Sequence, residues 1–272
     1  MTKFVRRSVC VVLTWSCLLG FAWSQNDARA TWKKVLSKCA KSDLVGKKVL
    51  YFGPSNAAGV GTVLRQKEDG GYGVRWFLKD LSSDGDLVIL GKSSDCSGES
   101  STSTTLSAGL ILNMLAAPLG GDLDLDLKKA TKTTVKVSGW TWDSLKEGSY
   151  EAAVRNSQSD YAADLKKPKR FLIERALRIQ GLTADVEFSR DVAAGLNLKY
   201  KGTLPGGGDA AAKLKGDWVN GTTLRITSES DPYIAGELAT YSESGLSGSG
   251  ARLIPVESVP DKAAISMDKP NQ

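Results

Sequence analysis

The chain has 272 residues, a formal net charge of +6 at neutral pH and no histidine. Without imidazole, the sequence excludes Ser-His-Asp and Cys-His nucleophilic catalysis and every zinc site that needs a histidine ligand. The net charge is too small for a dedicated nucleic-acid binder. We therefore expect no cofactor, no metal and no nucleic-acid partner.

The first 24 residues are typical of a secretory signal peptide. Basic residues Lys3, Arg6 and Arg7 precede an apolar run, Ser8–Trp23, and small residues that suit a signal peptidase precede Gln25. An uncleaved anchor is the alternative, because the run is only slightly shorter than a bilayer span. Cleavage would remove three positive charges and leave +3. We expect an exported protein, periplasmic or extracellular.

The segment Asp27–Lys41 is predicted to form a helix. Trp32, Val35, Leu36 and Cys39 follow the i, i+3, i+4, i+7 spacing of one helix face, and most of the basic residues lie elsewhere. A basic amphipathic helix can bind a membrane surface. The apolar stripe favours packing against the protein's own core.

Residues 44–91 contain short runs rich in valine, leucine and aromatic residues, separated by turn-forming clusters. Closely spaced short strands predict a small β-barrel. The stretch VGKKVLYFGPSNAAGVGTVLRQKEDGGYGVRW resembles an SH3-like barrel of the KOW or Tudor type, in which a G-x-G-x-V strand precedes a strand with aromatics. The matching residues are Gly59, Gly61 and Val63 in the first strand and Tyr72, Val74 and Trp76 in the second. The resemblance implies a fold and no particular ligand.

Two residues at the end of this stretch, Arg75 and Phe77, are the candidate ligand-binding residues. Side chains alternate along a strand, so both point away from the face that carries Tyr72. If that face fills the barrel, Arg75 and Phe77 lie outside, where SH3-like barrels commonly bind ligands through exposed aromatics. The alternative is that both faces are buried, one of them under the N-terminal helix.

Two cysteines, Cys39 and Cys96, lie outside the signal peptide. An even pair in an oxidising compartment predicts a disulfide bond. The pair flanks the predicted barrel, so the bond would join its ends. Two buried free thiols are the alternative.

The rest of the chain divides into three parts. Ser93–Thr105 has almost no apolar residues and is predicted to be a linker. Residues 106–244 are predicted to form an α+β domain, and residues 245–272 a mostly disordered tail. Together with the helix and barrel of residues 27–92, the expected fold class is mainly β or α+β, with antiparallel strands and hairpins.

Local signals within residues 106–244 predict individual elements. Short helices are expected within Ser149–Leu165, and Arg170–Gly181 fits either a strand or a helix that ends at Gly181. The stretches TADVEFSRD and GLNLKYKG alternate as strands do. Asn220-Gly221, between two alternating runs, predicts a hairpin with a type I′ turn.

The stretch GGDLDLDLKK resembles a calcium loop only in its three aspartates. An EF-hand loop needs a glycine after its third acidic position and a glutamate further on, whereas this sequence has Leu127 and then lysines. Strict alternation instead places Asp122, Asp124 and Asp126 on one side of a strand. The sequence favours a solvated strand face over a metal site.

Three functions remain open. The leading interpretation is a non-catalytic exported envelope protein that binds or scaffolds, with the cell wall, an anionic lipid surface or another envelope protein as partner. In the order of their elements, residues 106–241 resemble a gasdermin-like pore-forming domain, with KRFLIERALRI and PYIAGELATY as core strands. The resemblance implies long strands that insert into a membrane as a barrel, with a polar lumen. A carboxylate-dependent glycosidase is the third possibility, because acid pairs need no histidine.

Overall fold

The computed structural model describes residues 25–36, 48–56, 58–82, 85–96, 104–106, 126–127, 129–199, 214–242, 252–260 and 265–266. The protein is mainly β with a few helices, as the sequence predicts. None of the described helices has the length and apolar character needed to cross a bilayer.

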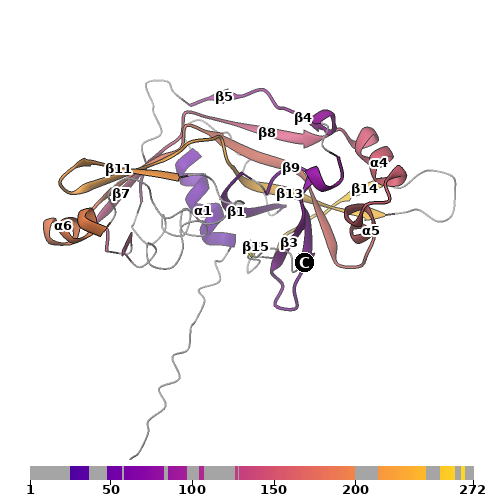
Figure 1. Cartoon of the computed structure of the whole chain (residues 1–272), viewed down its shortest axis with the longest axis horizontal. Coiled ribbons are helices and arrows are strands. Elements are labelled where there is room, and N and C mark those ends of the chain that lie inside the picture. Colours follow the sequence, from indigo (N-terminus) through magenta and orange to yellow (C-terminus); the bar gives the residue numbers. More distant parts are fainter. Residues whose placement is uncertain are drawn as a thin grey trace, which may run out of the picture.

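The described strands form two sheets. The larger sheet has the order β1-β13-β9-β2-β3-β15, and β8 also pairs with β9, β4 and β5 with β8, and β14 with β13. Its strands are β1 (Val49–Ser55), β2 (Val63–Gln66), β3 (Tyr72–Trp76), β4 (Val88–Ile89), β5 (Ser94–Asp95), β8 (Gly139–Leu145), β9 (Arg170–Gln180), β13 (Tyr233–Ser242), β14 (Arg252–Pro255) and β15 (Ile265–Ser266). All its pairs are antiparallel except β15 with β3. Figure 1 shows long strands such as β8, β9 and β13 running along the long axis of the molecule, whereas β3 runs across it.

The smaller sheet has the order β11-β12-β10-β7-β6, and all its pairs are antiparallel. Its strands are β6 (Thr104–Leu106), β7 (Lys132–Lys136), β10 (Thr183–Glu187), β11 (Leu214–Asn220) and β12 (Thr223–Ser228). The helices with described bounds are α1 (Gln25–Leu36), α4 (Glu147–Asn156), α5 (Asp160–Leu165) and α6 (Arg190–Lys199), with short 3-10 turns η2 (Leu78–Asp80) and η3 (Gly85–Leu87). In Figure 1, α6 lies at one end of the molecule and α4 and α5 at the other.

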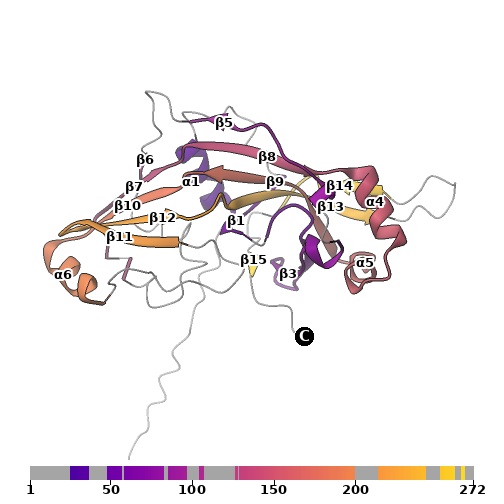
Figure 2. The ribbon, with the colours of Figure 1, turned by 45° about the horizontal axis from the view of Figure 1, so that its top comes forward.

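Two hydrophobic clusters lie on opposite faces of the larger sheet. The side chains of β1 alternate between them, Tyr51 in one cluster and Leu50 in the other, which explains why this strand is apolar almost throughout. The first cluster contains Trp32 of α1, α6 and the inner face of the smaller sheet. The second contains α4, α5, β2 and β3. Figure 2 shows α1 close to both sheets, in agreement with its contacts with β1 and β6.

Residues 44–91 do not form the predicted SH3-like barrel. Their strands join the larger sheet instead: Leu50 of β1 lies opposite Gly236 of β13, and Leu64 of β2 lies opposite Phe171 of β9. Alternation and turn signals identify a strand, but they do not say which strand it pairs with. The predicted linker and the predicted tail also contain strands, β5 and β6 in the former and β14 and β15 in the latter.

Several local predictions are confirmed. The N-terminal helix buries Trp32, Val35 and Leu36 as expected, and α4 and α5 lie where short helices are predicted. The ambiguous stretch Arg170–Gly181 is the strand β9. Gly181 follows it with φ of +57°, a conformation that favours glycine.

Two local predictions are wrong. The GLNLKYKG stretch is not a strand where the structure describes it, because Gly195–Lys199 belongs to α6. The Asn220-Gly221 hairpin forms between β11 and β12, but neither residue has the positive φ of a type I′ turn. Instead the Asn220 side-chain oxygen accepts hydrogen bonds from the backbone N–H of Thr222 and Thr223, both at 2.9 Å.

The structure contradicts part of the prediction for the aspartate stretch. Asp122 and Asp124 lie outside the described residues, as do Cys39 and the signal peptide. Asp126 is in a helical turn, not in a strand, and it is buried, with its carboxylate 2.8 Å from Lys129 Nζ. Asp126 is buried because the chain turns here, and the alternation of aspartate and leucine in the sequence does not predict such a turn. Cys96 is buried, and its disulfide bond to Cys39 stays a prediction.

Candidate functional site at the junction of the two sheets

Within the part of the chain that the structure describes, three connections carry it directly from one sheet into the other. β7 continues into β8 through Val137 and Ser138, β9 into β10 through Gly181 and Leu182, and β12 into β13 through residues 229–232. Backbone hydrogen bonds join the connections: Ser138 N–H donates to Gln180 at 2.8 Å, and Ser228 N–H donates to Leu182 at 3.1 Å. We call this region the sheet junction.

The sheet junction is closely packed around Gly181. A Cβ atom at this position would lie 2.3 Å from Ser138 Oγ, and the positive φ disfavours any other residue. Gly181 is therefore the residue that allows the chain to turn tightly from one sheet into the other.

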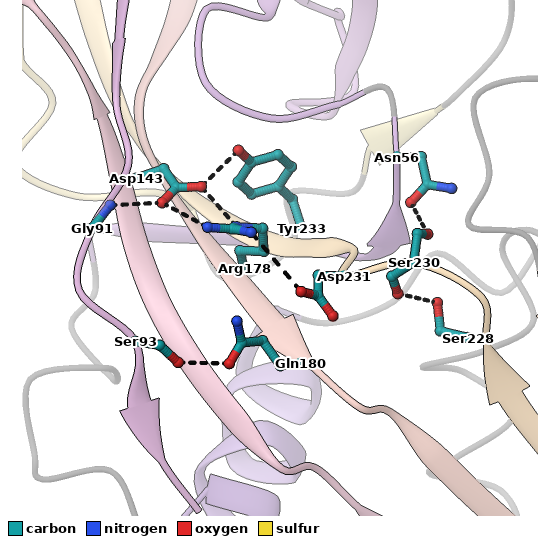
Figure 3. Close-up of polar contacts among 10 residues, drawn as sticks. All are labelled: Asn56, Gly91, Ser93, Asp143, Arg178, Gln180, Ser228, Ser230, Asp231 and Tyr233. Carbon is teal, nitrogen blue, oxygen red and sulfur yellow. Dashed lines mark hydrogen bonds and ion pairs between the residues drawn. The ribbon is translucent and has the colours of Figure 1, made fainter.

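Beside the junction, the carboxylate of Asp143 is fully buried (Figure 3). Its Oδ2 accepts hydrogen bonds at 2.8 Å from Arg178 Nε and from the Tyr233 hydroxyl. Its Oδ1 accepts a hydrogen bond at 2.9 Å from the backbone N–H of Gly91. A buried carboxylate needs such partners to remain charged. One side chain of β8 thus joins β9, β13 and the segment between β4 and β5.

The partners of Asp143 have further contacts around the junction. Arg178 Nη1 lies 3.9 Å from Asp231, in the connection between β12 and β13. Burial raises the pKa of the Tyr233 hydroxyl, and its hydrogen bond to the charged Asp143 raises it further. Figure 3 also shows Ser93 Oγ donating to Gln180 at 2.6 Å and Ser230 Oγ donating to Asn56 at 2.7 Å. The junction is held by polar contacts between elements that are far apart in the chain.

This arrangement is suited to holding strands together. The Asp143 carboxylate is occupied by a guanidinium, a hydroxyl and an amide, so it is not placed to act on a substrate. Within the described residues, no three acidic or cysteine side chains come together as metal ligands. The junction therefore matters for the two sheets that it connects.

The smaller sheet, which the junction connects to the rest of the protein, is amphipathic. Along β10, Ala184 and Val186 are buried, whereas Asp185 and Glu187 are on the opposite face. Ion pairs cross this opposite face: Asp185 accepts two hydrogen bonds from Arg225, at 2.6 and 2.9 Å, and Lys132 Nζ lies 3.1 Å from Glu187. The hydrogen bond from Arg225 is the main cause that lowers the pKa of Asp185. One face is apolar and the other charged.

The candidate ligand-binding residues lie elsewhere, on the β3 side of the larger sheet. Arg75 Nε is 3.6 Å from Asp164 Oδ2, and the half-buried Phe77 packs against the second hydrophobic cluster. Tyr72 and Val74 are buried as the alternation predicts. The structure does not bring Arg75 or Phe77 near the junction, and their role in binding stays a prediction.

Sequence reasoning did not find Asp143 or Arg178. The run Trp140–Leu145 alternates aromatic residues with Thr141 and Asp143, a pattern that would place the tryptophans inside. The structure has the reverse arrangement, with Thr141 and Asp143 buried and Trp142 half-buried. The guanidinium of Arg175 lies over the ring of Trp142, with its Cζ atom 5.1 Å from the ring centre. No local signal distinguishes this inverted face.

Comparisons with known proteins find a similarity among solved structures only. No family model matches the chain, and no curated protein matches it. Among solved structures, the chain is similar to a bacterial gasdermin from Bradyrhizobium tropiciagri, with 13% sequence identity and a TM-score of 0.48. That alignment covers 90% of this chain and 100% of the gasdermin.

Proposed function

We propose that the protein is a membrane-active, pore-forming protein of gasdermin-like design. The observation that carries the proposal is α6, a helix whose sequence has the period of a strand. In β10, Ala184 and Val186 form an apolar face at even-numbered positions. The same positions remain mostly apolar through the next element, with Phe188, Val192, Ala194, Leu196 and Leu198. Arg190 is the one polar residue that interrupts this apolar face.

The length of this segment matches a membrane. β10 has 5 residues, whereas a tilted membrane-spanning strand needs about 9–11. If α6 became extended, β10 and the residues of α6 would form one alternating strand that is long enough. Its apolar face would contact lipid and its polar face, with Asp185, Glu187 and Lys199, would line water.

The rest of the smaller sheet supports the same interpretation. Its apolar face now packs against α1 and α6 in the first hydrophobic cluster. A membrane could replace that cover at little cost, because lipid tails are as apolar as the side chains that they would replace. The Asp143 contacts would keep β8, β9 and β13 joined while the smaller sheet rearranged.

Leakage from vesicles tests the proposal. Purified protein is added to vesicles of phosphatidylethanolamine and phosphatidylglycerol that contain a self-quenched dye, and dye release is followed with time. We expect release at submicromolar protein. Binding to the vesicles without release would contradict pore formation and would support the binding or scaffolding role instead.

A matched pair of substitutions tests the role of α6. Gly195→Ala should stabilise the helix by about 1 kcal/mol, because glycine is a poor helix former. A Cβ at this exposed position meets no atom within 4 Å. If α6 must unwind, leakage should slow by about fivefold. Ala194→Val, at the neighbouring exposed position, lowers helix propensity and favours a strand, so leakage should accelerate.

Thermal unfolding is the control for this pair. The melting temperature should rise for Gly195→Ala and fall for Ala194→Val. If both melting temperatures shift as expected while both leakage rates equal that of the wild type, α6 does not unwind during pore formation.

A further inference from the structure

The tip of the hairpin between β11 and β12 contains the dipeptide Asn220-Gly221, and both residues are exposed. The backbone nitrogen that follows an asparagine can attack the side-chain amide, because the product is an unstrained five-membered imide. The attack has two requirements: the nitrogen must be open to approach, and the side-chain carbonyl must lie beside it. The hairpin tip meets both requirements.

The backbone nitrogen of Gly221 is open to approach. Glycine has no Cβ that would crowd this nitrogen, and the space around it is empty, since even an added Cβ would meet no atom within 4 Å. Among the described residues, the Gly221 N–H donates no hydrogen bond, whereas the N–H groups of Thr222 and Thr223 do. The nitrogen is therefore held by no partner that an attack would have to displace.

The side chain of Asn220 is folded back over the Gly221 peptide. Its Oδ1 accepts hydrogen bonds from the backbone N–H of Thr222 and of Thr223, both at 2.9 Å, and from Thr222 Oγ1 at 3.2 Å. An oxygen that binds the two amides beyond Gly221 keeps its carbonyl carbon close to the amide of Gly221 itself. Donors at this oxygen also stabilise the negative charge that develops on it when the carbonyl is attacked.

We propose that Asn220 is a site of spontaneous modification, at which the side-chain amide becomes a carboxylate through a cyclic imide with Gly221. The Gly221 nitrogen forms a bond to Asn220 Cγ, and the Nδ2 group leaves as ammonia with the proton that the nitrogen gives up. Water then opens one of the two C–N bonds of the imide, adding its hydroxyl to the carbonyl carbon and its proton to the nitrogen. Opening at Cγ gives aspartate, and opening at the main-chain carbonyl gives isoaspartate. No oxidant or reductant takes part.

The modification changes the place where β10 ends and α6 begins. The carbonyl oxygen of Thr222 accepts a hydrogen bond at 2.9 Å from the N–H of Phe188, which lies between these two elements. The rings of Phe188 and Trp218 are also close, with centroids 6.0 Å apart. Aspartate keeps the side-chain acceptor and the length of the main chain, whereas isoaspartate adds a carbon atom to the main chain and moves Thr222. Isoaspartate therefore loosens the attachment of Phe188 to the hairpin. This inference goes beyond the proposed pore formation and does not depend on it.

Peptide mapping of aged protein tests the modification. Purified protein is incubated at mildly alkaline pH, which favours attack by the amide nitrogen, and its peptides are followed by mass spectrometry. We expect the peptide with Asn220 to gain the mass that separates a carboxyl from an amide, and an isoaspartate methyltransferase to label it. Asn156, the exposed last residue of α4, is an internal control, because Ser157 after it has a Cβ. Equal conversion at both asparagines would overturn the assignment of Asn220.

Gly221→Ala is the matched variant. Alanine fits this position, because its Cβ meets no atom and the φ of Gly221 is not positive, but the Cβ crowds the attacking nitrogen. We expect conversion to slow by about tenfold, which corresponds to about 1.4 kcal/mol in the barrier. An unchanged rate in this variant would overturn the proposed attack.

The wild-type chain in urea measures the contribution of the fold. Because the hairpin already holds the carbonyl beside the Gly221 nitrogen, conversion of Asn220 in the native protein should be no slower than in the denatured chain. A lower native rate would show that the hairpin protects Asn220 and would overturn the proposal.

Thermal unfolding tests the effect on Phe188. The isoaspartate form, separated from the unmodified protein by ion exchange, should melt about 3 °C lower, the scale of one lost hydrogen bond in a chain of this size. Asn220→Asp has the charge of the product without the added main-chain carbon, and it should melt within about 1 °C of the wild type. An isoaspartate form that melts with the wild type, or an Asn220→Asp variant that melts as low as the isoaspartate form, would overturn the loosening of Phe188.

Discussion

Asp143 shows how a single side chain can join distant parts of a fold. Its carboxylate has no exposed surface and is bound by Arg178, Tyr233 and Gly91. Removing one member of a buried ion pair is costly, because the remaining charge keeps its burial and loses its partner. The hydroxyl of Tyr233 contributes one hydrogen bond to this charged acceptor, which is stronger than a bond between neutral groups but leaves the ion pair intact when it is removed.

This difference predicts unequal effects of two conservative substitutions. Asp143→Asn should lower the free energy of unfolding by about 3 kcal/mol, since Arg178, whose side chain is 22% exposed, loses its nearer counter-ion and keeps only Asp231, 3.9 Å away. Tyr233→Phe should cost about 1.5–2 kcal/mol, at the lower end for a hydrogen bond to a charged group, because the Asp143 carboxylate keeps its other partners. Chemical denaturation measures both values. A loss for Asp143→Asn that is no larger than the loss for Tyr233→Phe would mean that the Arg178 charge is solvated in another way.

At the scale of elements, Asp164 joins α5 to two strands. Arg170 at the start of β9 donates two hydrogen bonds to its carboxylate, at 2.9 and 3.1 Å, and Trp76 of β3 donates one at 3.2 Å. Burial alone would raise the pKa of Asp164, but the hydrogen bonds from Arg170 and Lys167, the charge of Arg170 and the hydrogen bond from Trp76 outweigh it. The pKa is held well below its ordinary value of 3.8.

The lowered pKa predicts how stability depends on pH. A carboxyl whose pKa is lower in the folded state contributes stability above its unfolded pKa, and this contribution is lost as pH falls toward the folded value. Asp164→Asn should therefore be about 3 kcal/mol less stable than the wild type at pH 7. The difference should shrink steadily below about pH 4.

Denaturation curves at several pH values between 7 and 2 measure this difference. Asp86→Asn, which changes an exposed carboxylate bound to Lys146, is the control and should have little effect at any pH. A difference for Asp164→Asn that does not change with pH would show that its charge plays no part in docking α5.

The sequence predicts elements well where the signal is local. The stripe of Trp32, Val35 and Leu36 identifies α1, and Asn220-Gly221 identifies the hairpin. It fails at α6, whose alternating residues Leu196, Asn197 and Leu198 read as a strand. The helix forms because Ala193 and Leu196, three positions apart, are both buried against the first hydrophobic cluster. Tertiary packing overrides the local period here.

At the scale of the whole molecule, the sequence predicts a barrel followed by a second domain. Local patterns of this kind do not show which strands pair with one another. The strands of residues 44–91 exist much as the sequence predicts, but β1 and β2 pair with β13 and β9. The sequence did not identify the junction residues Asp143 and Arg178 either, because their partners come from strands that are far apart in the chain.

The predicted disulfide bond also belongs to this scale. Cys39 follows α1, and Cys96 lies at the sheet junction, where its backbone N–H donates to Ser138 at 2.8 Å. A bond between the cysteines would tie the N-terminal helix to the junction and would stabilise the protein by about 4 kcal/mol in the chain-entropy description. Thiol titration of denatured, unreduced protein that begins at Gln25 should find no free thiol. Two thiols per chain would contradict the bond.

The pairing of β1 with β13 has a consequence for the order of events during synthesis. β1 is made early, but the strand with which it pairs, β13, is made near the end of the chain. The same holds for β15, one of the two strands that pair with β3. The larger sheet therefore cannot close while the polypeptide is still being elongated, and such non-local pairing makes folding slow. During that interval the apolar run of β1 has no partner and is open to aggregation. A chain that is threaded through an export channel before it folds would complete the sheet only on the far side.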